Sequence, residues 1–276
     1  MEFEIVRTIA AQEFRIHIRS RWTLLFGLVF GALALGISYF GLVTAGLVGF
    51  ESFTRTSASL LNLVIYLVPL IALTMGALSF TGERGAAELL FSQPVTRSEI
   101  LLGKVAGLFL SVATATGFGF GVAGVVIALN SDGSGGGAYL VLAGLTLLLA
   151  LVFLSLGTMV AVVAQKRARA FAQALFLWFF FVLFYDLLAI GLAFLLEERP
   201  ANLLIFCSLF GNPADMVRVA GLLVMGGASM FGAAGAMLLK FLGGPLPAGL
   251  LLTGALLFWV AVPLAVADRV LRRQDI

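Results

Sequence analysis

The chain has 276 residues, a mean hydropathy of +1.12 and a formal net charge of +3, and only 11% of its residues are charged. A soluble domain carries about 25% charged residues, so the composition excludes a soluble enzyme, a disordered chain, a coiled coil and a secreted disulfide scaffold. One cysteine, Cys207, and one histidine, His17, exclude an internal disulfide and the common zinc motifs. The composition predicts an all-α membrane protein that crosses the bilayer several times.

The first 21 residues are too polar to cross a membrane, because they carry four arginines and three glutamates. Apolar side chains recur there at steps of three and four, at Phe3, Val6, Ala10, Phe14 and Ile18. This spacing predicts an amphipathic elbow helix over residues 1–21 that lies in the membrane interface. An ordinary solvated leader is the alternative.

Six later segments are apolar and long enough to cross a bilayer. They lie at about 22–47, 60–80, 105–129, 138–164, 170–196 and 246–267. The stretch 219–239 is also apolar, but it is rich in glycine and therefore a poor helix by propensity. The count of spans is accordingly six or seven from hydropathy alone.

The distribution of Lys and Arg distinguishes the two counts. Six spans with a cytoplasmic N-terminus place 13 Lys and Arg residues inside and 4 outside, whereas a seventh span changes this to 11 and 6. The positive-inside rule favours six spans with both termini cytoplasmic, in the cytoplasmic (inner) membrane. Residues 197–245 then form an excursion on the outer side, with short helices that dip in part into the membrane.

Three pairs of glycines have the small-xxx-small spacing that lets membrane helices approach closely. They are Gly27 with Gly31, Gly103 with Gly107, and Gly117 with Gly121. Each pair is a candidate helix contact, although glycine is also simply common in membrane helices.

Residues 81–104, TGERGAAELLFSQPVTRSEILLGK, form the longest polar insertion on the inner side. Glu83 to Phe91 has the pattern of a short helix, and Pro94 forces a break after it. Thr96 to Glu99 is a capping box that starts a second helix, which runs straight into the third span. This helix-turn-helix on two rigid stems fits contact with a partner protein, and a simple re-entry turn fits the same physics.

This segment resembles the signature of ABC-2 type transporter permeases, although Ala86 and Ala87 depart from the usual Thr-Leu. The resemblance implies a single ABC-2 transmembrane domain over 1–276 whose segment 81–104 docks into a separate ATPase subunit. The implied ATPase-coupling residues are Glu83, Arg84, Gly85, Glu88, Pro94, Arg97 and Glu99. No GxxxxGK[ST] nucleotide loop occurs in the sequence, so ATP is expected to be handled by another chain, and this subunit is expected to be non-catalytic.

Shorter motifs resemble one branch of that family, the permeases of transporters that mature nitrous oxide reductase. They are Gly49 to Thr54, Ser59 to Leu63, and Asn212, Pro213, Ala214 and Asp215 with Arg218. The resemblance implies a homodimer that works with an ATPase subunit and a periplasmic copper-binding protein, with Asn212, Pro213, Asp215 and Arg218 as candidate contacts of the outer excursion. A generic ABC-2 exporter of a drug, a lipid or another hydrophobic substrate is the alternative.

Asp186 is the one acid near the middle of a predicted span, where an ionisable group is costly and normally faces the bundle interior. It is predicted to be either a structural carboxylate or a group in the transport pathway or at the dimer seam. A lone intramembrane acid disfavours both a membrane-embedded enzyme and an ion-coupled carrier.

Thioethers suit Cu(I), but packing explains the four methionines of the outer excursion better. They are Met216, Met225, Met230 and Met237. Membrane lipid is a predicted partner, whereas no metal, no cofactor and no nucleic-acid partner is predicted.

Overall fold

The computed structural model describes residues 3–48, 52–81, 95–130, 136–225, 239 and 243–273. In chain order the elements are α1 (Phe3–Ile18), α2 (Arg21–Val48), α3 (Ser52–Ser79), α5 (Arg97–Asn130), α6 (Gly136–Ala164), α7 (Arg167–Phe179), the π-helix η1 (Phe180–Phe184), α8 (Tyr185–Ala193), α9 (Glu198–Gly211), α10 (Pro213–Val224) and α12 (Pro245–Arg273). No strand occurs within these ranges. The predicted all-α fold is confirmed.

Six helical stretches in this part of the chain are long and apolar enough to cross a membrane, at Arg21–Phe40, Thr56–Ser79, Arg97–Val126, Gly136–Ala164, Arg167–Ala193 and Pro245–Arg273. Each predicted span falls on one of them. The third begins earlier than its apolar run, because the helix that starts at the capping box continues into it without a break. The fifth consists of α7, η1 and α8 in succession.

The region after the fifth span is a bent helical pair. Helices α9 and α10 meet at an angle of 100° around Asn212, and together they are long and apolar enough to count as one broken span or a re-entrant loop. Helix α10 ends at Val224. Most of the glycine-rich stretch 219–239 therefore lies outside the described residues.

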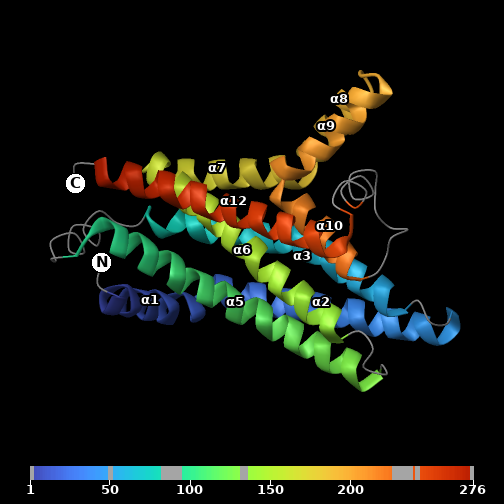
Figure 1. Cartoon of the computed structure of the whole chain (residues 1–276). Helices are drawn as coiled ribbons and strands as arrows, with labels where there is room; N and C mark the ends of the chain where they lie inside the picture. The colour runs from blue at the N-terminus through green and yellow to red at the C-terminus, as the bar shows by residue number, and fades with distance from the viewer. Residues whose placement is uncertain are drawn as a thin grey trace.

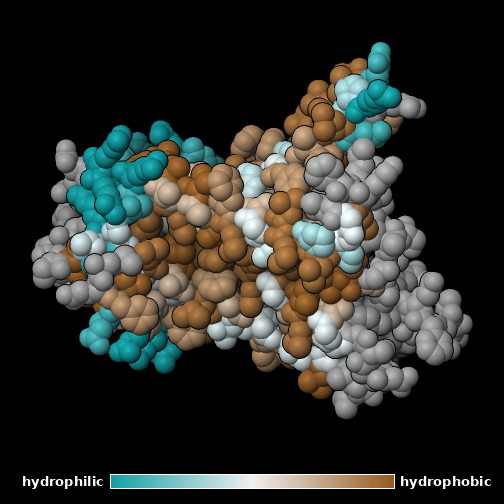
Figure 2. Space-filling view, in the orientation of Figure 1, coloured by the Kyte–Doolittle hydropathy of each residue, from teal (hydrophilic) through white to brown (hydrophobic). Residues whose placement is uncertain are grey.

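The two ends of the bundle differ in character. Figure 1 shows α1, the start of α5, the start of α7 and the end of α12 at one end, while α8 and α9 project at the other. Figure 2 shows hydrophilic residues gathered at the end that holds α1 and the end of α12, and again at the tip of α8 and α9, with an apolar band between them. This band is the surface expected to face lipid.

Helices α3 and α6 cross at the centre of the core. Gly76 and Gly157 lie at this crossing, and a Cβ on Gly76 would come within 2.6 Å of the Leu154 carbonyl oxygen. Buried side chains such as Ile65 and Phe153 fill the space along it. Packing of this kind, rather than hydrophobicity, drives helix association in lipid.

Two of the three predicted glycine pairs lie at helix contacts. Gly103 and Gly107 pack against α1, where a Cβ on Gly107 would lie 2.5 Å from the Ala10 carbonyl oxygen. Gly27 and Gly31 face α5, with 3.5 Å and 3.8 Å to the nearest atoms. The third pair, Gly117 and Gly121, has no neighbour within 4 Å in the described part of the chain. That pair makes no helix contact among the described residues of one chain, because spacing alone does not fix which face a helix buries.

Candidate functional site

Asp186 lies in the fifth span, and the structure brings it together with the outer-excursion residues. Arg218 Nη1 lies 3.0 Å from Asp186 Oδ2 and 2.7 Å from Asp215 Oδ1. Asn212 Nδ2 donates to the second oxygen of Asp215 at 2.8 Å. One guanidinium thus bridges two carboxylates from different helices. We call Asp186, Asn212, Asp215 and Arg218 the Asp–Arg cluster.

Asn212 organises the sharp bend at which α10 begins. Its Oδ1 accepts a hydrogen bond from the Ala214 backbone N–H at 3.1 Å, and Pro213 occupies the first turn, where its missing N–H costs nothing. Its Nδ2 also donates to the Phe181 carbonyl oxygen at 2.9 Å. Asn212 is only 1% exposed. The predicted outer contacts Asn212 and Pro213 are therefore buried within the chain.

The end of α9 needs donors, because a helix that stops leaves its last carbonyl groups unpaired and this is costly inside a membrane. Two side chains from other helices supply them. Tyr185 OH donates to the Ser208 carbonyl oxygen at 2.9 Å, and Trp259 Nε1 in α12 donates to the Phe210 carbonyl oxygen at 3.0 Å. The bend is thus held by the fifth and the last spans.

A π-helix ends two residues before Asp186. A π-turn inserts one extra residue into a helix, rotates the face that follows, and is frequent at functional sites. Here it spans Phe180–Phe184, and the Phe181 carbonyl oxygen within it accepts from Asn212. The π-helix and the bend are therefore joined directly, which places Asp186 opposite Arg218.

The chemistry available at the Asp–Arg cluster is ion pairing and hydrogen bonding. Carboxylates are hard ligands, whereas Cu(I) favours thiolate or thioether. Among the described residues no three or more His, Cys, Asp or Glu side chains lie close enough together to hold a metal ion. Met216 is fully buried in the apolar core, and Met225 is partly buried against the same core. The other two methionines, Met230 and Met237, lie outside the described residues.

The coupling segment is described only at its base. Glu83, Arg84, Gly85, Glu88 and Pro94 lie outside the described residues. The predicted capping box is present, since the Thr96 backbone N–H donates to Glu99 Oε2 at 2.9 Å and the Glu99 N–H donates to Thr96 Oγ1 at 3.4 Å. Glu99 is only 3% exposed, and its carboxylate caps the first turn of α5.

The start of α5 is bonded to the end of α12. Arg97 Nη1 donates to the Leu271 carbonyl oxygen at 2.6 Å, and Ser98 Oγ donates to Asp268 Oδ1 at 2.5 Å. Arg272 pairs with Asp268 at 2.9 Å and also donates to Ser98 Oγ. Sequence reasoning missed this contact, although Asp268 and Arg272 have the i,i+4 spacing of a helical ion pair.

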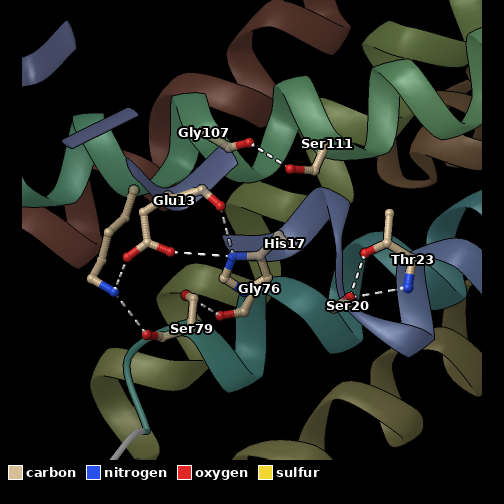
Figure 3. A network of polar contacts seen from close by, with 9 residues as sticks. Glu13, His17, Ser20, Thr23, Gly76, Ser79, Gly107 and Ser111 are labelled. Atoms are coloured by element: carbon tan, nitrogen blue, oxygen red, sulfur yellow. Dashed lines mark hydrogen bonds and ion pairs between the residues drawn. The ribbon is translucent and has the colours of Figure 1, made fainter. Parts of the chain in front are cut away.

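A second polar network ties α1 to α3 and α5. Lys104 Nζ lies 2.5 Å from Glu13 Oε1 and donates to the Ser79 carbonyl oxygen at 3.3 Å, while His17 Nδ1 lies 3.3 Å from Glu13 Oε2. Figure 3 shows Glu13 and His17 pointing toward one another beside Ser79. The sequence carried a signal that was missed: Glu13, three residues after Ala10, lies on the apolar stripe of α1.

Opposing effects set the pKa of Glu13. Burial of its carboxyl raises the pKa. The hydrogen bond to His17, together with the charge and the hydrogen bond of Lys104, lowers the pKa by more than burial raises it. The pKa of Glu13 therefore lies below its usual value, and the carboxylate is charged at neutral pH.

Comparison with known proteins extends along almost the whole chain. The family described as "ABC-2 family transporter protein" matches residues 7–276. The chain belongs to the ABC-2 family of transporter permeases. It is 38% identical over 279 residues, covering 99% of both chains, to the "Probable ABC transporter permease protein NosY" of Pseudomonas aeruginosa. It is 35% identical over 277 residues, covering 98% of both chains, to the protein of the same name from Stutzerimonas stutzeri. The resemblance carried by residues 81–104 is thus confirmed, and this permease is a membrane subunit of an ABC transporter.

Proposed function

We propose that the permease couples ATP hydrolysis on a separate ATPase subunit to transport or mechanotransmission across the cytoplasmic membrane, in the assembly of the copper sites of nitrous oxide reductase. The near-full-length similarity to two NosY permeases carries the proposal. Under this proposal the permease subunit is itself non-catalytic, forms a homodimer and has a periplasmic copper-binding partner. Both termini and residues 82–94 face the cytoplasm, where ATP is found.

The contacts at the base of the coupling segment support a mechanical role. The segment connects α3 to α5, and α5 is bonded to α12 through Arg97 and Ser98 and to α1 through Lys104. A push on the segment therefore acts on several helices together. Glu83, Arg84 and Glu88 then make the polar contacts with the ATPase, whereas Arg97 and Glu99 hold the base.

Helix α12 supports a link between the base of the coupling segment and the bend at Asn212. Asp268, Leu271 and Arg272 contact the start of α5 at one end, and Trp259 bonds the end of α9. These two sets of contacts are about nine residues apart, or roughly 13 Å along a helix. Movement of α5 is thereby passed along α12 to the bend beside the Asp–Arg cluster. Because Asn212 and Pro213 are buried, Arg218 and Asp215 are the members of the bend that contact an outer partner.

The test is the copper content of the reductase in cells that lack the permease gene. The reductase should still be made but should lack its normal catalytic copper–sulfur centre, as seen in its absorption spectrum, and a plasmid copy of the gene should restore that spectrum. A normal spectrum in the deletion strain would contradict the proposal and favour a generic ABC-2 exporter of a drug, lipid or other hydrophobic substrate.

A further inference from the structure

A groove opens between the fourth and fifth spans at the end of the bundle that holds α1 and the end of α12. Its volume is about 260 Å³, and it is lined by Met159, Val160, Val163, Gln173, Phe176 and Leu177. Val163 is 54% exposed and Phe176 is 69% exposed, so the groove opens on the lateral surface of the bundle. Five of its six lining side chains are apolar, which fits a hydrocarbon chain rather than water.

Basic side chains occur in and just after the turn that joins the two helices of this groove. Helix α6 ends at Ala164, three residues before α7 begins at Arg167, and Lys166 lies in the tight turn between them. Lys166 and Arg169 are both exposed, and neither makes an ion pair within the described ranges. Their charge is therefore available to a ligand from outside the chain.

The register of α7 places one of these charges on the helix face that lines the groove. Arg169, Gln173 and Phe176 follow at steps of four and three, so they lie on one face of the helix. Arg167 lies two positions before Arg169, a turn of about 200°, and so belongs to the opposite face. The chain thus offers a matched pair of arginines, one aligned with the groove and one turned away from it.

We propose that this groove binds one anionic phospholipid of the surrounding bilayer, with an acyl chain between α6 and α7 and the phosphate at Lys166 and Arg169. Both parts of the ligand have a counterpart: an apolar slot for the hydrocarbon, and for the headgroup two exposed cations that have no ion pair with any described residue. Basic pockets between membrane helices bind anionic headgroups in this way, and long basic side chains reach the headgroup level readily. The bound lipid fills the seam between the fourth and fifth spans.

The test is native mass spectrometry of the full, delipidated chain titrated with dioleoyl-phosphatidylglycerol or dioleoyl-phosphatidylcholine. The first phosphatidylglycerol should bind wild type at least about fivefold more tightly than the first phosphatidylcholine. Lys166→Gln with Arg169→Gln should bring that ratio close to one, whereas Arg167→Gln should keep it. Equal binding of the two lipids to wild type, or equal loss from Arg167→Gln and Arg169→Gln, would overturn the proposal.

Two further experiments are added. One separates the contribution of the acyl chain from that of the headgroup, and the other distinguishes a lipid ligand from a protein ligand. Val163→Trp should fill the groove and weaken phosphatidylglycerol binding with the charges intact, and glycerol phosphate, which has no acyl chain, should not displace the lipid. Displacement by glycerol phosphate would overturn the lipid assignment even if Val163→Trp does not fold. The double variant Lys166→Gln with Arg169→Gln could also lose the ATPase subunit while keeping its preference for phosphatidylglycerol. That result would assign the two cations to the protein partner instead of the lipid.

Discussion

Arg218 of α10 reaches Asp186 of the fifth span, 32 residues earlier, through a contact of 3.0 Å between Nη1 and Oδ2. The same nitrogen lies 2.7 Å from Asp215 Oδ1, so one cation serves two carboxylates. The arginine therefore matters more than either acid. Removing one acid leaves Arg218 a partner, whereas removing the arginine leaves two carboxylates facing each other.

This asymmetry predicts unequal effects in the cluster. Asp186→Asn should lower the free energy of unfolding by about 1 kcal/mol or less, because its side chain is partly exposed and its shape is kept. Arg218→Gln should lower it by about 1–3 kcal/mol, and adding Asp186→Asn to that variant should recover part of the loss. Denaturant unfolding of the purified permease in one detergent measures all three. Equal effects of the two single changes, with no recovery in the double variant, would refute the shared-cation account.

The bond from Trp259 to α9 gives the second prediction. Trp259→Phe keeps most of the apolar contact but removes the donor to the Phe210 carbonyl oxygen. An unpaired backbone carbonyl in an apolar setting costs about 1–3 kcal/mol, so the melting temperature should fall. Trp22→Phe is the matched control, since Trp22 is 74% exposed on the surface. A fall as large in Trp22→Phe would show that loss of the indole, and not of this bond, is responsible.

Glu13 predicts a dependence on pH. Because its pKa is lowered in the folded chain, its ionised form stabilises the fold above the ordinary value of 4.5, and this contribution is lost as the pH falls through the lowered pKa. Wild type should therefore be more stable than Glu13→Gln at neutral pH, and the difference should shrink below pH 4.5. Melting temperatures between pH 3 and 8 test this.

The control for the pH series is Glu4→Gln. Glu4 lies exposed on the same helix, and its substitution removes the same charge as Glu13→Gln. It should follow wild type across the whole range. A gap between Glu13→Gln and wild type that stays constant down to the lowest pH would contradict the assignment to the Glu13 carboxylate.

The sequence predicted the spans well because a bilayer imposes length and hydropathy on each one separately. The capping box at Thr96 and Glu99 was also predictable, since both partners lie within one helical turn. The pairing of Asp186 with Arg218 was not, because it depends on a 100° bend at Asn212 and on a π-helix that no local pattern announces. Both residues were nevertheless candidates separately, one for its charge in a span and one by resemblance.

The contacts between helices were predictable only in part. Glycine spacing located the face of α5 that meets α1, but it overlooked Gly76 and Gly157 at the central crossing. Their small partners four residues away are the alanines Ala72 and Ala161 rather than glycines. The bonds of Arg97 and Ser98 to α12 join residues about 174 apart in sequence. Such pairs follow from how the helices pack, and a single sequence does not contain that information.

The most direct test of coupling is whether the ATPase subunit co-purifies with the permease after its charges in residues 82–94 are reversed. Glu83→Arg with Glu88→Arg should abolish recovery of the ATPase, because like charges then face each other across the interface, while Glu83→Gln with Glu88→Gln should only weaken it. Glu4→Arg, an exposed reversal at the same end of the bundle, should leave recovery unchanged. With membrane insertion checked in every variant, loss of the ATPase from the reversed pair alone is the predicted result. Full recovery of the ATPase by that inserted variant would contradict the assignment of this segment as the docking surface.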